Sequence, residues 1–431
     1  MQTYSSSPLN TSPATRVAVP GSKSHTNRAL LVAALADGKT TLENALFSDD
    51  SQYFAQALTD LGFVVSPNEQ EKIITILGLD GRIPKAQADL FIGNAGTAAR
   101  FLTAMLTLGH GEYRLDGVER MRQRPIGDLI LALNKLGAQT GGEPPDEDDP
   151  RSICPPVTVI AAGLSGGVTS IRGDISSQFL SGLLMVAPYA QDEVEIVVDG
   201  PLHSKPYIDL TLGVMADFGM RVQREGYERF RISPQRYHTP GNYAIESDAS
   251  AASYFFAAPA ICGGWVEVAN LSRSARQGDI AFLDVLEQMG CAVTEVPGAI
   301  RVKGPQHLCG VDVNMSDISD TSMTLAAIAP FADSPTTIHG IASSRVKETD
   351  RVAATVAELR RLGIQVDEHA DGMTIYPCEN IKPGKVNPYN DHRIAMAFTL
   401  IGLRIPGIEI ENPSCVEKTF PNYYEVLDSL Y

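Results

Sequence analysis

The stretch A-L-T-D-L-G at residues 57–62 is the first of a series of helix endings that recurs along this chain. It returns as L-N-K-L-G at 133–137, M-A-D-F-G at 215–219, L-E-Q-M-G at 286–290 and L-R-R-L-G at 359–363, and V-L-D-S-L-Y closes the chain at 426–431. The apolar residues have helical spacing, and glycine readily adopts the left-handed conformation that follows many helices. The copies lie roughly 70–80 residues apart, a period that indicates six structural repeats.

A second series of motifs runs in step with the first. Polar residues precede six apolar segments: K-S-H-T-N-R before Ala29, G-T-A-A-R before Phe101, S-S-Q before Phe179, D-A-S-A-A-S before Tyr254, D-T-S before Met323 and D-H-R before Ile394. Most of these segments are apolar nearly all round, so we expect buried helices. Val- and Ile-rich runs, such as 73–77, 157–160 and 194–198, predict strands between them. Each repeat of this α/β fold therefore has one buried and one amphipathic helix, and three repeats would fill one domain of about 200 residues.

The net charge limits the partners of the chain. It has 35 basic and 51 acidic residues among 431, a formal charge of -16. Such a surface repels nucleic acid and anionic membranes. A basic cluster inside this chain is therefore better explained by a small anionic ligand.

The cysteines and the N-terminus exclude other classes. The six cysteines form no C-x-x-C pair, so we predict no metal site, no cofactor and a reducing, cytoplasmic location. Residues 1–15 lack the basic and apolar regions of a signal peptide, and we expect a frayed tail there. No apolar run reaches the roughly 20 residues of a membrane span.

Cations gather where helices are expected to begin. Lys23, Ser24 and Arg28 follow a Pro-Gly turn, Gly96 lies in N-A-G-T-A-A-R, and Arg124 precedes a proline. Each single motif is also compatible with simple helix capping or a solvated loop. Capping does not explain the cations, however, because a positive charge opposes the dipole at a helix N-terminus. We therefore interpret the series as an anion-binding cleft.

Further polar motifs extend this pattern. Ser176, Ser177 and Gln178 stand at one helix start, and S-K-P-Y at 204–207 adds hydroxyls suited to a phosphate monoester. The run R-V-K-E-T-D-R at 345–351 packs three cations and two acids between a strand and a helix. D-H-R at 391–393 and K-T-F-P at 418–421 complete the set.

Taken together, these motifs resemble the 5-enolpyruvylshikimate-3-phosphate synthase family of enolpyruvyl transferases. Eight motifs follow the family's order from Pro20 to Pro421. The resemblance implies a two-domain inside-out α/β barrel of six βαβαββ-type repeats, three per domain, with buried helices pointing their N-termini at an interdomain cleft. It places domain I at residues 1–21 plus 247–431 and domain II at residues 22–246.

The resemblance also implies a reaction and its residues. The enolpyruvyl group of phosphoenolpyruvate would pass to the 5-hydroxyl of shikimate 3-phosphate, in the shikimate pathway to chorismate and aromatic amino acids. Shikimate 3-phosphate would be bound by Lys23, Ser24, Arg28, Ser176, Ser177, Gln178, Ser204, Tyr207, Asp320, Ser343 and Lys347. Phosphoenolpyruvate would be bound by Lys23, Gly96, Arg124, Gln178, Arg351, Arg393 and Lys418. At position 343 the family often has Asn, which leaves one substrate hydrogen bond open.

The expected chemistry accounts for these residue types. An alcohol needs a base to become a nucleophile at neutral pH, and the resemblance assigns that role to Asp320. The methylene carbon of phosphoenolpyruvate must gain a proton, from Glu348 or Lys23. The cations can neutralise the substrate anions without a metal ion.

Three alternative functions fit the sequence less well. A UDP-N-acetylglucosamine enolpyruvyl transferase would share the fold, but residues 111–125 lack the expected loop cysteine. An RNA-end cyclase is disfavoured by the charge of -16. A catalytically inactive binding module would be expected to have lost some of the catalytic side chains.

Three further expectations concern behaviour in solution. We expect a monomer that binds neither nucleic acid nor membranes. We expect the domains to close when substrate anions neutralise their like charges. Because Gly96 leaves room beside phosphoenolpyruvate, we expect glyphosate to inhibit.

Overall fold

The structure, a computed structural model, describes residues 2–143 and 149–431. The chain divides into two compact units, Met1–Pro20 with Glu246–Tyr431 (unit 1) and Gly21–Ile245 (unit 2). These borders lie one residue from the predicted domain boundaries, and the independent folding of each unit as a domain stays a prediction. Within the described ranges, no helix is long and apolar enough to cross a membrane.

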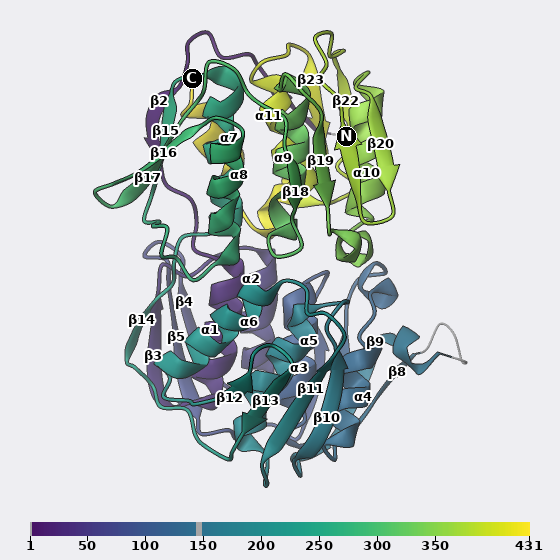
Figure 1. Cartoon of the computed structure of the whole chain (residues 1–431). Helices are drawn as coiled ribbons and strands as arrows, with labels where there is room; N and C mark the ends of the chain where they lie inside the picture. Colours follow the sequence, from purple (N-terminus) through teal and green to yellow (C-terminus); the bar gives the residue numbers. More distant parts are fainter. Residues whose placement is uncertain (1, 144–148) are drawn as a thin grey trace. The chain divides into compact units, whose positions relative to one another are not determined.

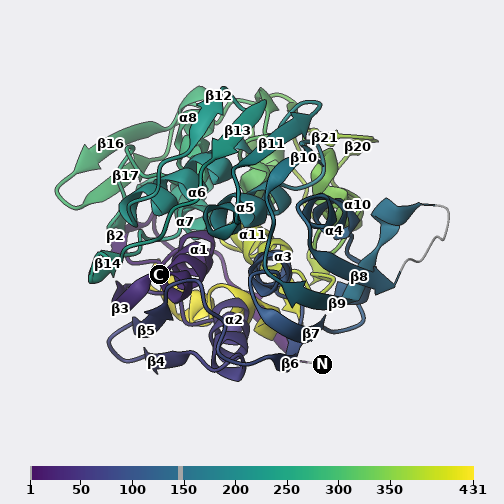
Figure 2. The same ribbon diagram turned by 90° about the horizontal axis from the view of Figure 1, so that it is seen from below.

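Three sheets of the same connectivity form the outside of unit 2 (Figures 1 and 2). In each, a parallel pair of strands is followed by an antiparallel hairpin. The strand orders are β14 (Asn242–Ala244), β3 (Asp37–Glu43), β5 (Ile73–Leu79), β4 (Val64–Asn68); β6 (Gln87–Phe91), β7 (His110–Asp116), β9 (Cys154–Ala162), β8 (Gln139–Glu143); and β10 (Gly167–Arg172), β11 (Val194–Asp199), β13 (Arg229–Ile232), β12 (Gln223–Glu225).

Unit 1 repeats this arrangement in two of its sheets, and its third sheet has three strands that form one antiparallel and one parallel pair. Its sheets are β16 (Ala292–Val296), β17 (Ala299–Lys303), β15 (Trp265–Ala269), β2 (Ala14–Val17); β18 (Asp312–Asn314), β19 (Thr336–His339), β21 (Gly372–Ile375), β20 (Val366–His369); and β1 (Thr3–Ser6), β23 (Ile408–Glu411), β22 (Gly384–Val386). The chain is thus an α/β protein with six similar sheets among the described residues, three in each unit, as the repeat pattern predicted.

The helices alternate between two kinds, which the sequence also predicted. Nearly every residue is buried in α1 (Lys23–Leu35), α3 (Gly96–Leu106), α5 (Ser177–Val186), α7 (Ala249–Cys262), α9 (Ser322–Ile328) and α11 (His392–Gly402). The other helices keep one polar face: α2 (Asp49–Asp60), α4 (Gly127–Lys135), α6 (Lys205–Asp217), α8 (Phe282–Gln288), α10 (Arg351–Arg361) and α12 (Tyr423–Asp428). Each fully buried Leu or Phe contributes about 1.5–3 kcal/mol to folding, so these helices form the core.

The glycines that end the repeated phrases have the predicted conformation. All five, Gly62, Gly137, Gly219, Gly290 and Gly363, have φ between 84° and 101°. A side chain with Cβ is strained in this region, so glycine terminates each helix at low cost.

The expectation of a frayed N-terminal tail is wrong. Thr3–Ser6 pairs with Glu411–Ile408 as β1, and Ala14–Val17 pairs with Trp265–Val268 as β2. The polar composition of this segment concealed the strands, because each is an edge strand whose backbone hydrogen-bonds to a partner strand far away in the sequence.

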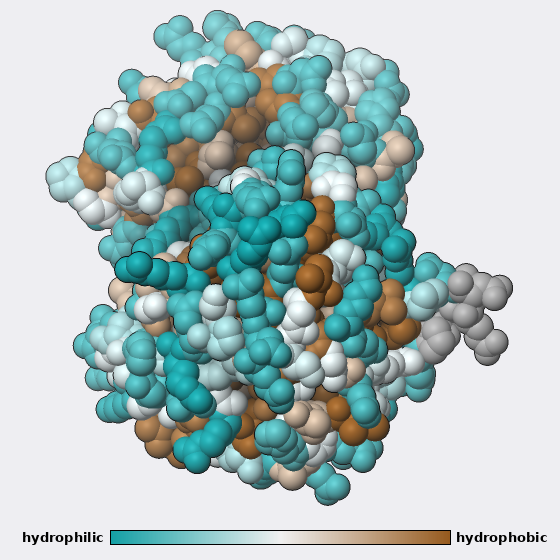
Figure 3. All heavy atoms as spheres, turned by 60° about the horizontal axis from the view of Figure 1, so that its bottom comes forward, coloured by the Kyte–Doolittle hydropathy of each residue, from teal (hydrophilic) through white to brown (hydrophobic). Residues whose placement is uncertain are grey.

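On the face shown in Figure 3, hydrophilic side chains predominate and hydrophobic ones form patches between them.

Candidate active site

Unit 1 carries a network of ion pairs centred on Asp320. Its Oδ1 accepts from Lys347 Nζ at 2.6 Å and from Arg351 Nη1 at 3.0 Å, and its Oδ2 accepts from Arg393 Nη2 at 2.7 Å. These donors come from the segment before α10, from the first turn of α10 and from the first turn of α11. Three cations therefore surround this carboxylate and donate hydrogen bonds to both of its oxygens.

Glu348 joins the same network through Arg351. Its Oε2 accepts from Arg351 Nη2 at 2.9 Å and its Oε1 accepts from Lys418 Nζ at 3.0 Å. Glu348 and Lys418 are 9% and 8% exposed, so little water screens this pair.

Arg351 is the hub of the network and is 2% exposed. Besides Asp320 and Glu348 it contacts Asp391, which is fully buried and accepts from Nε at 2.7 Å. Burial by itself lowers the pKa of Arg351, but the carboxylates of Asp391, Glu348 and Asp320 together raise that pKa above its usual value. Arg351 therefore stays charged, as a group that binds anions must.

Unit 2 holds a buried cation of a different kind. The Arg28 guanidinium donates to Thr211 Oγ1 at 2.7 Å, to Ser181 Oγ at 3.1 Å and to the carbonyls of Ser24 and Tyr207. Hydroxyls and carbonyls solvate a charge less well than water does, and burial lowers the pKa of Arg28 to about 10. An anion near Arg28 would compensate this buried charge.

The contacts around Arg28 also orient the buried helices of unit 2. Arg28 and Phe101 lie five residues after the start of α1 and α3, and Ser181 lies four residues after the start of α5, so all three are between one and one and a half turns from a helix start. Arg28 contacts both other side chains, with its guanidinium 5.2 Å from the centre of the Phe101 ring. The N-termini of α1, α3 and α5 therefore lie at the same end of unit 2, which favours anions there.

Two further cations of unit 2 lie at these helix starts. Lys23 Nζ is 3.4 Å from Asp50 Oδ2. Arg124 Nη1 donates to Asn94 Oδ1 and O, both at 3.1 Å, and its buried Nε has no partner among the described residues. A Cβ added to Gly96 would lie 2.4 Å from Arg124 Nη2, so only glycine leaves this guanidinium in place.

The predicted hydroxyl groups stand at the starts of two adjacent helices. Ser176 caps α5 by accepting from the Gln178 N–H at 3.3 Å, and Ser177 is buried in the first turn. Ser204 precedes α6 with φ of 56°, a conformation that is strained for a residue with a side chain. Tyr207 accepts from Arg28 through its carbonyl.

Ser343 is the exception among the predicted residues. It lies in the short 3-10 helix Ala342–Val346, and no side-chain contact links it to the Asp320 network within the described ranges. The same ranges hold no group of three or more His, Cys, Asp or Glu that could bind a metal ion.

Several residues that shape the site were not predicted. Asp391 is one, although its place directly before His392 and Arg393 was a usable signal. No sequence pattern pointed to Asp50, Thr211 and Ser181. Each binds a cation on a different helix, so the contact forms only when the helices pack. Tyr254 lies in the core near the network: burial raises the pKa of its hydroxyl, and the charges of Arg393 and Arg351 oppose that rise.

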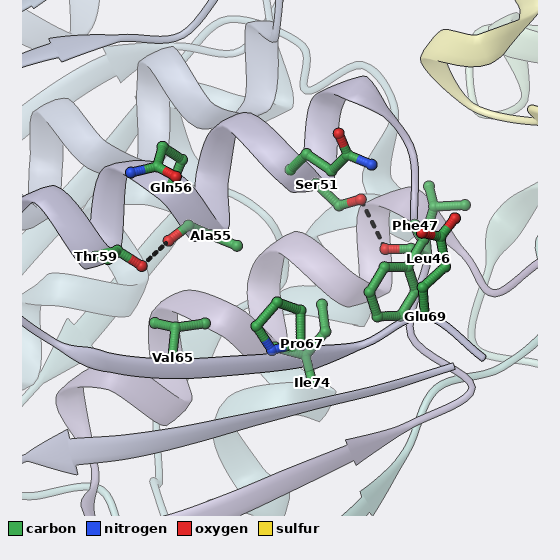
Figure 4. A pocket seen from close by; sticks show the side chains of 11 residues that line it. Leu46, Phe47, Ser51, Ala55, Gln56, Thr59, Val65, Pro67, Glu69 and Ile74 are labelled. Atoms are coloured by element: carbon green, nitrogen blue, oxygen red, sulfur yellow. Dashed lines mark hydrogen bonds between the residues drawn. The ribbon is translucent and has the colours of Figure 1, made fainter. Parts of the chain in front are cut away.

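A separate cavity of about 370 Å³ lies between α2 and the β4–β5 hairpin (Figure 4). It contains none of the predicted site residues. Its hydroxyls are already engaged, because Ser51 donates to the Leu46 carbonyl and Thr59 to the Ala55 carbonyl. The charged networks, not this cavity, are therefore the candidate active site.

The comparison with known families agrees with the motifs. The family model of EPSP synthase (3-phosphoshikimate 1-carboxyvinyltransferase) matches residues 11–427. A 3-phosphoshikimate 1-carboxyvinyltransferase of Trichormus variabilis is 49% identical over 424 residues, 98% of each chain. The chloroplastic enzyme of that name from Solanum lycopersicum is 45% identical, over 95% of this chain and 81% of its own.

The fold also has a solved counterpart. The 2.37 Å structure of EPSP synthase from Acinetobacter baumannii superposes with a TM-score of 0.82. It is 27% identical in sequence and the match covers 99% of this chain and 98% of the other.

Proposed function

Because this chain belongs to the EPSP synthase family, we propose that it transfers the enolpyruvyl group of phosphoenolpyruvate to the 5-hydroxyl of shikimate 3-phosphate and releases phosphate. The observation that carries the proposal is the single network in unit 1 that joins Asp320, Lys347, Glu348, Arg351, Arg393 and Lys418. Four cations around two carboxylates suit a reaction in which both substrates are anions.

Asp320 is proposed as the base of the addition step. The oxygen of the 5-hydroxyl bonds to C2 of phosphoenolpyruvate, and its proton passes to the Asp320 carboxylate. Lys347, Arg351 and Arg393 then turn toward the substrate anions, because their hold on Asp320 weakens as it is protonated.

Glu348 is proposed to protonate C3, with Lys23 as the second candidate. In the elimination step C3 returns its proton to Glu348, the departing phosphate takes the proton held by Asp320, and the bond between C2 and the phosphate oxygen breaks, which leaves the enol ether and free phosphate. Glu348 lies between Arg351 and Lys418, both proposed to bind phosphoenolpyruvate together with Arg393, Arg124 and Gly96. A bound carboxylate or phosphate would compete with Glu348 for these cations, and Glu348 could then take up the proton that it transfers to C3.

Shikimate 3-phosphate is proposed to bind through the helix starts of unit 2 and through residues of unit 1. Arg28, Lys23 and the hydroxyls of Ser24, Ser176, Ser177 and Ser204 suit its phosphate, with Gln178 and Tyr207 beside them. Asp320, Lys347 and Ser343 complete the set. Ser343 is the weakest member, since nothing in the described residues links it to the network.

The cytoplasmic location and the monomeric state belong to the same proposal, as does the treatment of the two units as domains. Light scattering on the purified protein tests the monomer. Small-angle X-ray scattering with and without both substrates tests the predicted closure, and an unchanged radius of gyration would contradict it.

The acceptor is tested by exchanging it. Purified protein with phosphoenolpyruvate is given either shikimate 3-phosphate or UDP-N-acetylglucosamine, and the products are followed by ³¹P NMR. We expect turnover only with shikimate 3-phosphate. Turnover only with the UDP-sugar would assign the chain to the other branch of enolpyruvyl transferases.

A further inference from the structure

The segment that leads into α11 contains an unusual turn. Tyr389 and Asn390 are consecutive residues with φ of 53° and 56°, the left-handed region that favours glycine. A bulky residue such as tyrosine keeps this conformation only when its surroundings hold it there. The contacts of residues 387–391 therefore decide where the next residues lie.

A buried carboxylate holds this turn. Glu358, in the second half of α10, is 0% exposed. Its Oε2 accepts from the Asn387 N–H at 3.0 Å, and its Oε1 accepts from the Tyr389 hydroxyl at 2.9 Å. The turn is also closed on itself, because Asn387 Oδ1 accepts from the Tyr389 N–H at 2.8 Å. Glu358 thus binds both the backbone and the side chain of the strained segment.

The same helix holds the far end of the segment. Arg351 lies seven residues before Glu358, which is two helical turns along one face of α10. It binds Asp391, which also caps α11 by accepting from the Arg393 N–H at 2.9 Å. Arg393 in turn reaches Asp320 at 2.7 Å. The position of the turn therefore sets the positions of Asp391 and Arg393.

We propose that Glu358 is a positioning residue: by holding the strained turn at 387–390, it places Asp391 and Arg393 against Arg351 and Asp320. Within the described residues Glu358 contacts Asn387, Tyr389 and, at 3.2 Å, Arg361, and none of these three belongs to the Asp320 network. Its effect on the reaction rests on the proposed function, in which Arg351 and Arg393 bind phosphoenolpyruvate.

The kinetic test compares two substitutions of similar size. Glu358→Leu removes both acceptors, and we expect the KM for phosphoenolpyruvate to rise about tenfold while the KM for shikimate 3-phosphate changes less than about twofold. Glu358→Gln can keep both contacts with the turn, since its carbonyl can accept from Asn387 and its amide can donate to the Tyr389 oxygen, while it gives up only the ion pair with Arg361. We expect it to restore the KM. A residue needed only for folding would lower the active fraction, and hence kcat, at unchanged KM.

A second test relieves the backbone strain at residue 389. Glycine adopts positive φ without the penalty of a Cβ. In the Glu358→Leu background, Tyr389→Gly should therefore raise the melting temperature and bring the KM for phosphoenolpyruvate back toward the wild-type value. Glu287→Leu on the surface of α8, where Glu287 pairs with Arg273, is the matched control and should leave both KM values unchanged.

The outcomes separate this inference from the proposed function. The melting temperatures are read without substrate, so they test the turn even if the wild type fails to perform the transfer. If Glu358→Leu does not fold, Tyr389→Phe replaces it, because it removes one hydrogen bond of Glu358 and should raise the KM for phosphoenolpyruvate about threefold. A wild-type KM in the variant that is used, or no recovery of stability with Tyr389→Gly, would overturn the proposal.

Discussion

Asp391 and Arg351 form a two-point ion pair in the interior of unit 1, with Nε to Oδ2 at 2.7 Å and Nη2 to Oδ1 at 3.3 Å. Asp391 is fully buried and Arg351 is 2% exposed. This pair fixes the guanidinium that also binds Asp320 and Glu348, the two residues proposed to move protons.

Removing the charge of Asp391 should therefore destabilise the protein and weaken phosphoenolpyruvate binding together. Asp391→Asn leaves the buried Arg351 with an incomplete partner set, and breaking such a pair costs about 3–5 kcal/mol. Chemical denaturation and the KM for phosphoenolpyruvate measure the two effects. The control is Asp367→Asn, because Asp367 is an exposed residue of β20 whose carboxylate accepts from the Tyr376 hydroxyl at 2.8 Å. Equal stability of both variants would contradict the account.

A methyl group at Gly96 should displace Arg124. The added Cβ would meet Arg124 Nη2 at 2.4 Å, and the end of a flexible side chain moves more readily than the backbone. We expect Gly96→Ala to raise the KM for phosphoenolpyruvate about tenfold and to raise the glyphosate concentration needed for inhibition, with the melting temperature unchanged. Gly141→Ala in β8 is the control, because a Cβ there would meet no atom of the described residues within 4 Å. A wild-type KM in Gly96→Ala would show that Arg124 does not bind this substrate.

Binding of shikimate 3-phosphate should weaken at high pH. Burial lowers the pKa of Arg28 to about 10, so this side chain is charged below pH 10 and becomes neutral above it. Only the charged form attracts a phosphate, and the reciprocal of the KM should fall about tenfold per pH unit above that point. Because a bound phosphate stabilises the charge, the bend should move to higher pH in the complex. Arg28→Gln should bind weakly and lose the part of the bend that Arg28 contributes, and far-UV circular dichroism checks that the protein stays folded. The same bend in Arg28→Gln would assign it to another group.

Glu348 should be needed for proton exchange at C3. In D₂O, the reversible addition step exchanges the methylene hydrogens of phosphoenolpyruvate for deuterium, which ¹H NMR detects. Glu348→Gln cannot transfer a proton, and we expect exchange and kcat to fall about 10²- to 10⁴-fold. Lys23→Met should bind substrates more weakly but still exchange at saturation. Normal exchange in Glu348→Gln, together with its loss in Lys23→Met, would assign the proton to Lys23.

The fold could be predicted largely because its signals are local. Gly62 and its counterparts end helices through their own left-handed conformation, and the buried helices are apolar on every face. The strands β1 and β2 were missed because their partners, such as Glu411 for Thr3, lie in distant parts of the chain. Single-sequence patterns carry no information on such pairings.

The same difference between local signals and long-range contacts applies to the candidate site. The charged residues stand in recognisable motifs, so Asp320, Glu348 and Arg393 could be selected before their contacts were seen. The partners that hold cations in place could not, because Asp50 and Thr211 meet Lys23 and Arg28 only after the helices pack. The left-handed turn could not be predicted either, because neither of its two residues with positive φ, Tyr389 and Asn390, is glycine.

Phosphate release by the purified protein tests the proposed transfer most directly. The protein is given phosphoenolpyruvate alone, shikimate 3-phosphate alone, and the two together, and free phosphate is measured over time. The account predicts release only with both substrates, and its near-complete loss in Asp320→Ala. Release from one substrate alone, or none from the pair, would contradict the proposed reaction.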